Sequence, residues 1–258
     1  MKFGGHAVLF KDKIKTDTEW VISGLAKAGC EGTEIGSRFF GTEDKARLLS
    51  ILDANKLQMS GMHVGVGFAD WLNKTDEVIE NVIMPVARFV SDMPNKNIIM
   101  SGSHKDTEGL DMAAVARAID KGAKRCREMG VAINYHNHSG EFEHNGVVFN
   151  ALADNSTELR FAVDLGWAFH AGYDIIKLLK ARKGRIKYVH LRDARSQGSG
   201  VKDFCNLGEG IIDYKELLTV LSDVLGPDGW AVVEYEEGEE DMNRYANAMK
   251  FLKGFGIR

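Results

Sequence analysis

Short apolar runs alternate along the chain with longer segments whose apolar positions recur at helical spacing. NIIMSGS (97–103) shows the first pattern, and DMAAVARAIDKGAKRCREMG (111–130) shows the second and ends in glycine. This pair of patterns occurs eight times. The predicted strands are 3–8, 32–37, 57–66, 97–103, 131–138, 159–167, 185–194 and 230–237. The predicted helices are 17–29, 42–55, 76–93, 111–130, 147–155, 173–184, 213–226 and 240–256.

This strict alternation predicts the fold class. Strands that are separated by helices pair in parallel through right-handed crossovers. Eight such units in 258 residues are what a closed (β/α)₈ barrel, or TIM barrel, requires. An open doubly wound sheet is the competing fold, but no GxGxxG motif follows the first predicted strand. With only three prolines and no linker-like segment, we expect residues 1–258 to form a single barrel domain.

Composition narrows the classes of function. Hydrophobic residues make up 44% of the chain and charged residues 27%, as in soluble globular proteins. The formal net charge is −4 without a basic tract, which argues against a nucleic-acid partner. No window reaches the roughly 18 uninterrupted apolar residues of a membrane span, and no signal peptide is evident. Three widely spaced cysteines without a CxxC motif indicate free thiols, so we expect a cytoplasmic protein.

Ionisable residues lie where the last predicted strands end. In a (β/α)₈ barrel the functional groups sit at the C-terminal ends of the strands. Side chains alternate along a strand, so Phe161 and Val163 should face the helices while Asp164 faces the barrel. The same alternation points His190 and Glu234 inward from their strands.

The preceding strand ends in YHNHSGEF (135–142), which offers further polar groups on the same rim. His136 and His138 share the inward face, and Glu141 follows where its side chain can fold back. Carboxylates crowded into a partly dry mouth would repel one another and take up protons. A divalent cation removes that problem. A set of carboxylates with imidazole suits Mn²⁺ or Mg²⁺, with Zn²⁺ or Co²⁺ as alternatives.

At these residues the chain resembles the sugar phosphate isomerase/epimerase superfamily, the xylose isomerase-like TIM barrels. The resemblance covers nearly the whole length. Known members include keto-sugar epimerases, hydroxypyruvate isomerase, inosose dehydratase and the metal-bearing subunit of C-glycoside-cleaving enzymes. The motifs that carry it are YHNHSGEF (135–142), VDLGW (163–167), GRIKYVHLRDA (184–194), NLGEGIIDY (206–214) and WAVVEYEE (230–237).

The resemblance implies metal-dependent carbohydrate chemistry, with Mn²⁺ as the first choice of metal. The family's ligand set would fall on Glu141, Asp164, His190 and Glu234, and the two glutamates would double as proton acceptor and donor. In the epimerase branch a glutamate stands at the end of strand five, where this chain has His136. The first ligand therefore stays open among His136, His138 and Glu141.

A second departure from the epimerases is Trp167, which stands where that branch places a histidine. Its aromatic face suits a sugar ring or a cyclitol, although packing under a loop explains it equally well. Both departures move the chain toward the dehydratase-like branch.

The chemistry that we infer is proton removal from a carbon beside a carbonyl, which gives an enediolate that a metal stabilises. Glu234 or Glu141 takes the proton, and His136, His138 or the other glutamate returns it. Return of the proton to carbon makes the enzyme an isomerase or epimerase of a keto sugar or related polyol. Departure of a β-hydroxyl or glycosidic group makes it a lyase, of the inosose dehydratase or 3-keto-glycoside-eliminating type.

Further polar residues of the rim are candidates for substrate binding, although each is equally plausible as an ordinary strand-end residue. The glycine-containing segment 196–210 is long for a βα loop and is a candidate lid. No glycine-rich phosphate cradle is evident. The candidate substrate-binding residues are Glu34, His63, His104, Trp167, Arg192 and Arg195.

Two other classes of function compete with the enzyme hypothesis. Abasic-site nucleases share the barrel but need a larger metal cluster and a basic DNA face. A sugar-binding subunit that is active only with a partner is the second. Because relatives are often dimers or tetramers, we also expect self-association.

Overall fold

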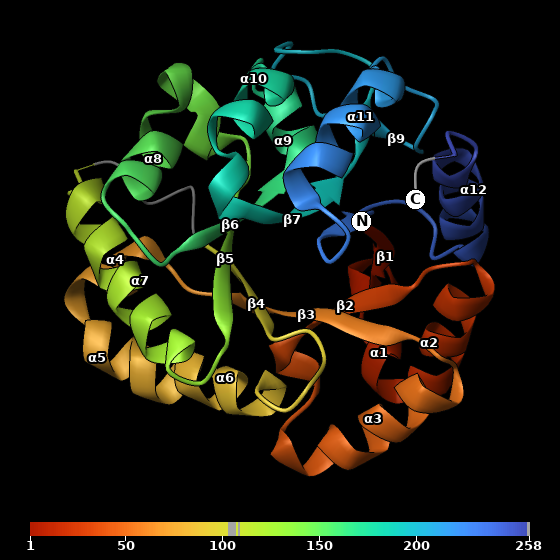
Figure 1. Cartoon of the computed structure of the whole chain (residues 1–258), viewed down its shortest axis with the longest axis horizontal. Coiled ribbons are helices and arrows are strands. Elements are labelled where there is room, and N and C mark those ends of the chain that lie inside the picture. The colour runs from red at the N-terminus through yellow and green to blue at the C-terminus, as the bar shows by residue number, and fades with distance from the viewer. Residues whose placement is uncertain (103–106, 108, 257–258) are drawn as a thin grey trace.

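Eight parallel strands form a closed barrel in the computed structural model, which describes residues 1–102, 107 and 109–256 (Figure 1). Around the barrel the strand order is β1, β10, β7, β6, β5, β4, β3 and β2. The fold class predicted from the alternating pattern is therefore confirmed. The barrel strands are β1 (Lys2–His6), β2 (Gly32–Gly36), β3 (Gln58–Gly65), β4 (Asn97–Ser101), β5 (Ala132–His136), β6 (Arg160–Asp164), β7 (Ile186–Leu191) and β10 (Trp230–Val233).

The first and last barrel strands close the sheet. Strand β1 pairs with β2 on one side and with β10 on the other, so that Gly4 lies opposite both Gly32 and Val232. Strand β10 in turn pairs with β7, which places Val232 opposite His190. Closure by pairing leaves no free edge for another strand to join.

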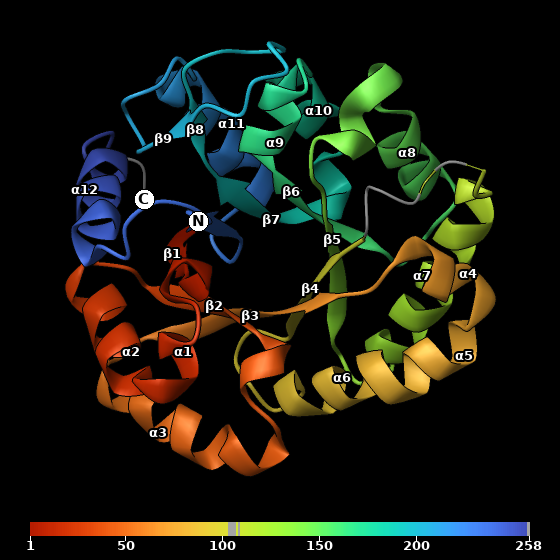
Figure 2. The same ribbon diagram turned by 180° about the vertical axis from the view of Figure 1, so that it is seen from behind.

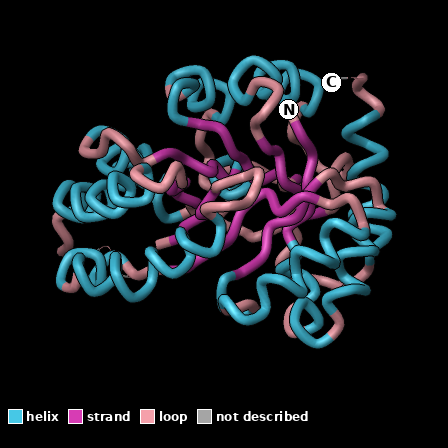
Figure 3. The backbone as a smooth tube through the Cα atoms, turned by 60° about the horizontal axis from the view of Figure 1, so that its bottom comes forward, coloured by secondary structure: helices cyan, strands magenta, loops and turns pink. Residues whose placement is uncertain are grey.

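Helices surround the barrel, and at least one follows each barrel strand, as Figures 1 and 2 show from opposite sides. The side view in Figure 3 shows the strands crossing the middle of the molecule with helices outside them. The helices are α1 (Lys13–Thr16), α2 (Thr18–Lys27), α3 (Lys45–Ala54), α4 (Phe68–Asn73), α5 (Thr75–Val78), α6 (Met84–Val90), α7 (Met112–Arg127), α8 (Glu143–Asp154), α9 (Leu165–His170), α10 (Ile175–Ala181), α11 (Tyr214–Leu225) and α12 (Met242–Lys253).

The core has two parts that follow the alternation of side chains along the strands. Outward-facing residues such as Phe161 and Val163 pack against the helices in the larger cluster, as predicted. The inward-facing residues form a separate cluster inside the barrel, which is the filled interior expected of this fold. Its members are Ile99, Ala162, Tyr188, Trp230 and Val232.

Trp230 fills the barrel interior where β10 begins and leaves no room for a side chain on β2. A methyl group at Gly32 would lie 2.5 Å from Cη2 of the Trp230 indole. The indole is buried, and its N–H donates a hydrogen bond of 3.2 Å to Asn95. Gly32 is therefore required by the close approach of the ring and not by its backbone conformation.

Asp120 on α7 fixes the segment that leads into β6, at the barrel end opposite the C-terminal ends of the strands. Its carboxylate accepts hydrogen bonds from the backbone N–H groups of Thr157 (2.9 Å), Glu158 (2.7 Å) and Leu159 (3.0 Å). Burial alone would raise the pKa of the Asp120 carboxyl. The N–H groups outweigh burial and hold that pKa below its usual value.

The three cysteines, Cys30, Cys126 and Cys205, are free and buried. Burial raises the pKa of Cys30 and of Cys126 to about 12, so both thiols stay protonated at neutral pH. Among the described residues, no helix has both the length and the apolar character needed to cross a bilayer.

We predict that Gly32→Ala lowers the free energy of unfolding by about 1–3 kcal/mol, because the added methyl group overpacks the interior against Trp230. Chemical denaturation measures the loss. Gly184→Ala is the matched control, since a methyl group there meets no atom of the described residues within 4 Å. It should stay within about 0.5 kcal/mol of wild type. Equal stability of the two variants would contradict the packing argument.

We predict that Asp120→Asn lowers the free energy of unfolding at pH 7 by about 1–3 kcal/mol, because the ionised carboxylate accepts several hydrogen bonds. A carboxyl whose folded-state pKa is depressed stabilises the fold above its unfolded pKa of about 3.9 and loses this effect as the pH falls. The difference between wild type and variant should therefore shrink below about pH 4. Urea titrations at several pH values would reveal a constant difference if this account were wrong.

Candidate metal and active site

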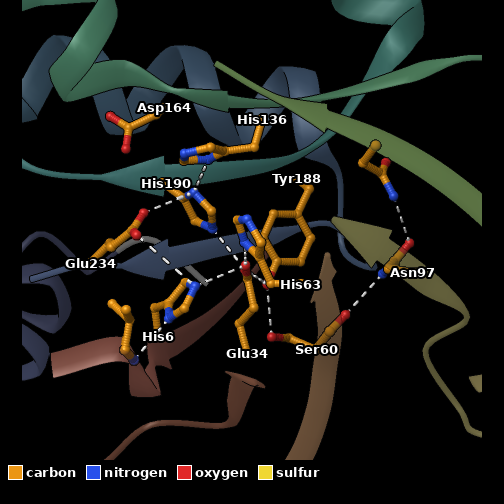
Figure 4. A network of polar contacts seen from close by, with 12 residues as sticks. His6, Glu34, Ser60, His63, Asn97, His136, Asp164, Tyr188, His190 and Glu234 are labelled. Carbon is orange, nitrogen blue, oxygen red and sulfur yellow. Dashed lines mark hydrogen bonds and ion pairs between the residues drawn. The ribbon is translucent and has the colours of Figure 1, made fainter. Parts of the chain in front are cut away.

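Four side chains from consecutive strands converge at the C-terminal ends of the barrel (Figure 4). His136 ends β5, Asp164 ends β6, His190 lies in β7, and Glu234 directly follows β10. One donor atom of each lies within 4.8 Å of the other three, and all four residues are buried. The group combines two imidazoles with two carboxylates, which are all usable metal ligands.

His190 is at the centre of this group. Its Nδ1 lies 2.6 Å from Nδ1 of His136 and 3.0 Å from Oε2 of Glu234. This Glu234 oxygen is buried and accepts no hydrogen bond from the residues that the structure describes. A buried carboxylate oxygen without a hydrogen bond is costly, and it faces two ring nitrogens that can share a cation with it. The donor set therefore fits a divalent metal ion.

Arg192 neutralises the carboxylates on the outer side of the group. Its guanidinium lies 2.7 Å from Asp164, 3.2 Å from Glu234 and 3.2 Å from Glu236, and the residue is only 3% exposed. The guanidinium also lies over the ring of Trp167, at 5.6 Å. Arg192, predicted as a substrate-binding residue, is thus held among the site's own carboxylates.

Asp164 has a structural task besides its place in the group. One carboxylate oxygen accepts the backbone N–H of Trp167 at 2.8 Å and so caps helix α9. The other oxygen accepts from Nε of Arg192. Burial raises the pKa of the Asp164 carboxyl to about 6, even though Arg192 pulls it down.

Behind His190 lies a second group, centred on Glu34, which also contains His6 and His63 (Figure 4). The Glu34 carboxylate is fully buried and contacts His6 at 3.1 Å, His63 at 2.8 Å and His190 at 2.6 Å. It also accepts a hydrogen bond of 2.7 Å from the hydroxyl of Tyr188. The two groups are therefore joined through His190.

The ionisable side chains of the two groups shift one another's pKa values. Burial would raise the pKa of the Glu34 and Glu234 carboxyls, but neighbouring side chains keep both well below the usual value. His190 and His6 lower the pKa of Glu34, and Arg192 and His190 lower the pKa of Glu234. Burial lowers the pKa of His190, yet Glu34 and Glu234 raise it to about 9. Burial and the nearby His190 lower the pKa of His136, so its ring is neutral.

Glu141, predicted as the first metal ligand, lies in a different environment. It is buried, and its carboxylate accepts the hydroxyl of Tyr135 at 2.6 Å and the backbone N–H of His138 at 3.0 Å. Burial and Glu141 raise the pKa of Tyr135 well above its usual value, so this hydroxyl stays protonated and donates. The structure does not bring Glu141 into the four-residue group, where His136 occupies the corresponding place.

A pocket of about 170 Å³ opens above the two groups. Its walls come from the C-terminal ends of the strands and the loops that follow, where this fold carries its active sites. His63 and His138, both sequence candidates, line it, whereas Glu34 does not. The other lining residues that carry ionisable groups are His6, Arg38, His136, Glu234 and Glu236.

Three other residues that were predicted to bind substrate do not line this pocket or lie outside the residues that the structure describes. Trp167 is half-buried and packs edge-on against Phe204, with ring centroids 4.7 Å apart. Arg195 is exposed and pairs with Glu209 at 3.6 Å. His104 lies outside the described residues. Trp167 thus packs against Phe204, and its contact with a sugar ring stays a prediction.

The candidate lid, 196–210, follows the short strand β8 (Asp193–Ala194) and contains its antiparallel partner β9 (Phe204–Cys205). Asp193 then anchors the segment that follows, because its carboxylate accepts the backbone N–H groups of Gly208 at 3.0 Å and Gly210 at 3.1 Å. A methyl group at Gly210 would lie 2.1 Å from an Asp193 oxygen. The HLRDA and NLGEG motifs are thus one structural unit beside the site.

Sequence reasoning missed Tyr188 and Ser101 as parts of the site. His63 contacts Ser101 at 3.0 Å, and Tyr188 and His6 both contact Glu34. Tyr188 could have been found, because it lies two residues before His190 and so faces the same side of β7. No signal in the sequence pairs Ser101 with His63, since that contact depends on how β3 and β4 are staggered.

The fold and the buried histidine–carboxylate group define a class, a TIM barrel with a candidate metal centre at the C-terminal ends of its strands. A model of the xylose isomerase-like TIM barrel family matches residues 22–255. The chain therefore belongs to the xylose isomerase-like TIM barrel family, as the sequence motifs indicated.

Curated relatives of the chain are enzymes. It is 26% identical to an inosose dehydratase of Lacticaseibacillus casei, over 91% of this chain and 87% of that protein. It is also 26% identical to an inosose dehydratase of Clostridium beijerinckii, over 91% of this chain and 87% of that protein.

Solved structures share the fold. A sugar phosphate isomerase/epimerase from Parabacteroides distasonis has a TM-score of 0.78 at 15% identity, covering 100% of this chain and 96% of that one. A probable 3-DHS dehydratase from Bacillus anthracis has a TM-score of 0.76 at 16% identity, covering 98% of this chain and 99% of that one. At such identities the likeness shows the barrel alone.

Proposed function

We propose that the protein is a divalent-metal-dependent isomerase or epimerase of a keto sugar or related polyol. The reaction begins with removal of a proton from a carbon beside the carbonyl group. The observation that carries this proposal is the convergence of His136, Asp164, His190 and Glu234 beneath a pocket at the C-terminal ends of the strands. Family membership supports the same chemistry.

The metal ligands in this proposal are His136, Asp164, His190 and Glu234, so His136 replaces the Glu141 of the family-based expectation. Two imidazoles and two carboxylates form a softer set than three carboxylates and one imidazole. The exchange favours Mn²⁺, Co²⁺ or Zn²⁺ over Mg²⁺, which prefers oxygen ligands and keeps several waters. Mn²⁺ remains our first choice because half of the set is carboxylate. When bound, the metal supplies Lewis-acid stabilisation of the negative charge that develops on the substrate oxygens.

Glu234 is the base in this proposal. Its pKa is held well below the usual value by Arg192 and His190, so the carboxylate is ionised at neutral pH. It lines the pocket, and its Oε2 accepts no hydrogen bond from the described residues. This oxygen has two lone pairs, so one is available for a substrate proton while the other faces the metal site. A positioned base of this kind contributes about 10²–10⁴-fold to the rate.

His138 is the group that returns a proton or protonates a leaving group. It lines the same pocket and follows His136 on the loop after β5, so it approaches the substrate from another wall than Glu234 does. Its ring centroid lies 5.1 Å from that of His136, which places it beside the ligand group. Arg38, on the opposite wall after β2, binds substrate oxygens in this proposal. His63 lies in β3 and lines the pocket with its ring, because Glu34 and Ser101 hold both of its nitrogens.

Dehydration is the second candidate function, and the curated relatives named inosose dehydratase favour it. It shares the first step, since Glu234 removes the same proton. The two reactions differ in what His138 protonates. Proton return to carbon completes an isomerisation or epimerisation, whereas proton transfer to a β-hydroxyl releases water.

The ligand set predicts a specific pattern of metal retention. Wild-type protein dialysed against Mn²⁺ should hold one ion per chain. His136→Ala and Glu234→Gln should each weaken binding by at least about tenfold, because the first removes a donor nitrogen and the second replaces a charged carboxylate with a neutral amide. Glu141→Gln should keep the metal, because Glu141 contacts Tyr135 and the backbone of His138 instead. Elemental analysis and calorimetric titration measure the binding.

Loss of the metal in Glu141→Gln with retention in His136→Ala would restore the family-based ligand set. Mn²⁺ at about 100 times its dissociation constant should add about 2.7 kcal/mol to the stability of wild type. Lys183→Gln is a surface control, since among the described residues this lysine forms an ion pair only with the exposed Asp223.

The reaction itself is tested by incubating the metal-loaded protein with 2-keto sugars, 3-keto sugars and inososes in D₂O. Deuterium incorporated into product without other mass change indicates an isomerase or epimerase, and loss of water indicates a dehydratase. In His138→Gln, turnover should fall about 10²–10⁴-fold while the metal is retained, because the proton-returning group is lost. Exchange of the substrate proton should persist in this variant, because Glu234 still removes it. If none of the keto compounds exchanges a proton with the solvent, the proposal is wrong.

A further inference from the structure

The Glu34 carboxylate accepts hydrogen bonds from all sides. Oε1 contacts Nε2 of His6 and Nδ1 of His63, and Oε2 contacts Nε2 of His190 and the hydroxyl of Tyr188 (Figure 4). A carboxylate offers about four lone-pair sites, so all of them are occupied. Because Glu34 is fully buried, it has no exposed oxygen to offer a substrate.

The position of one backbone N–H fixes the proton of His6. The N–H of Val8 donates to Nδ1 of His6 at 2.9 Å, so this nitrogen is an acceptor. The proton of the neutral ring therefore lies on Nε2, which donates to Glu34. Metal binding at Nε2 would move this proton to Nδ1, against the Val8 N–H. His6 is thus a hydrogen-bond donor and is not available as a ligand.

The remaining contacts of Glu34 can be assigned in the same way. Nδ1 of His63 donates to the carboxylate, which leaves Nε2 to accept from the Ser101 hydroxyl at 3.0 Å. The Tyr188 hydroxyl donates to Glu34, and Ser60 lies 2.8 Å from the same hydroxyl and can donate to it. A single arrangement of protons therefore gives every hydrogen bond around Glu34 one donor and one acceptor.

This arrangement determines which atom His190 presents to the ligand group. Its Nε2 carries a proton that points at Glu34, so only Nδ1 faces His136 and Glu234. We infer that Glu34 is a positioning residue that fixes the tautomer and ring orientation of His190, so that Nδ1 is directed toward the metal site. The inference rests on the proposed function in so far as Nδ1 binds a metal. It assigns Glu34 a role behind the ligand, in place of the substrate contact expected from sequence.

A carboxylate behind a histidine ligand has a known physical effect. It prevents the ring from turning, selects the nitrogen that binds, and increases the basicity of that nitrogen. His6, His63 and Tyr188 hold Glu34 itself in place, so strands β1, β2, β3 and β7 all contribute to the orientation of one ring. Loss of such a partner weakens metal binding by about 10–100-fold in metalloproteins.

Glu34→Gln tests the inference, because the amide group brings two N–H donors into a cage that is already made of donors. We expect the affinity for Mn²⁺ or Zn²⁺, measured by calorimetric titration, to fall about 10–100-fold. ¹⁵N NMR of the histidine rings supplies the second measurement, with His190 assigned through a His190→Asn variant. In wild type, with or without metal, the Nε2 proton of His190 should be strongly deshielded and slow to exchange. In Glu34→Gln this signal should be lost or shifted upfield.

Asp120→Asn is the matched control, since it alters a buried carboxylate at the other end of the barrel. It should lower stability yet leave both the His190 signal and the metal affinity unchanged. Tyr188→Phe is a milder variant that removes one donor from the oxygen that accepts from His190. The hydrogen bond from His190 to that oxygen should strengthen, and its Nε2 proton should move further downfield.

The outcomes separate this inference from the proposed function. Wild type that binds no divalent metal while showing the deshielded Nε2 proton would overturn the function and support the positioning role. Wild type in which Nε2 of His190 carries no proton, or a Glu34→Gln variant with unchanged signal and affinity, would overturn the inference. A fall in the affinity of Asp120→Asn equal to that of Glu34→Gln would also overturn it, because general destabilisation would then explain both.

Discussion

The site depends on the compensation of three buried, negatively charged carboxylates at the C-terminal end of one barrel. Glu34, Asp164 and Glu234 are each at most 3% exposed, and ionised groups so far from water are stable only when opposite charges and donors surround them. The chain supplies these from other strands, with His190 between Glu34 and Glu234, and Arg192 between Asp164 and Glu234. Each cation therefore serves two carboxylates. Removing one cation would leave two anions undercompensated, so the charges of the mouth act as a unit.

The two cations, Arg192 and His190, differ in whether they can give up their proton and bind a metal instead. Arg192 stays charged at any relevant pH and has no lone pair, so it can only neutralise. His190 can hold a proton or present a lone pair, so charge at its place can be carried either by a proton or by a bound cation. The neutral ring of His136 and the Glu234 oxygen without a hydrogen bond lie on the same side of His190. The atoms that could hold a metal therefore lie on this side of His190. On the Arg192 side, the charge of the guanidinium neutralises the carboxylates at every relevant pH.

The alternating pattern predicted the barrel because helix and strand periodicities are local and strong. Side-chain parity likewise placed Asp164, His190 and Glu234 on one rim, since each lies within or next to a regular strand. The alternation of side chains holds only within a strand and predicts no direction for residues beyond its end. The direction of the Glu141 side chain could therefore not be predicted from it. The turn after β5 directs its carboxylate to Tyr135 and the backbone of His138 and leaves His136 facing the group. The burial of Arg192 against Trp167, and the link from Ser101 to His63, depend on loop packing and strand stagger that no single segment encodes.

The pairing of β10 with both β1 and β7 has a consequence for how the polypeptide matures. The site combines His6 from β1, the first barrel strand in the sequence, with Glu234, which directly follows β10, the last one. Contacts between residues so distant in sequence form only after the intervening chain has been synthesised and its ends have met. A nascent chain that still lacks residues 230–233 has no sheet between β7 and β1, and its histidines and acids have no fixed common centre. The complete group of buried side chains should therefore assemble only once β10 has been made and has paired with both neighbours.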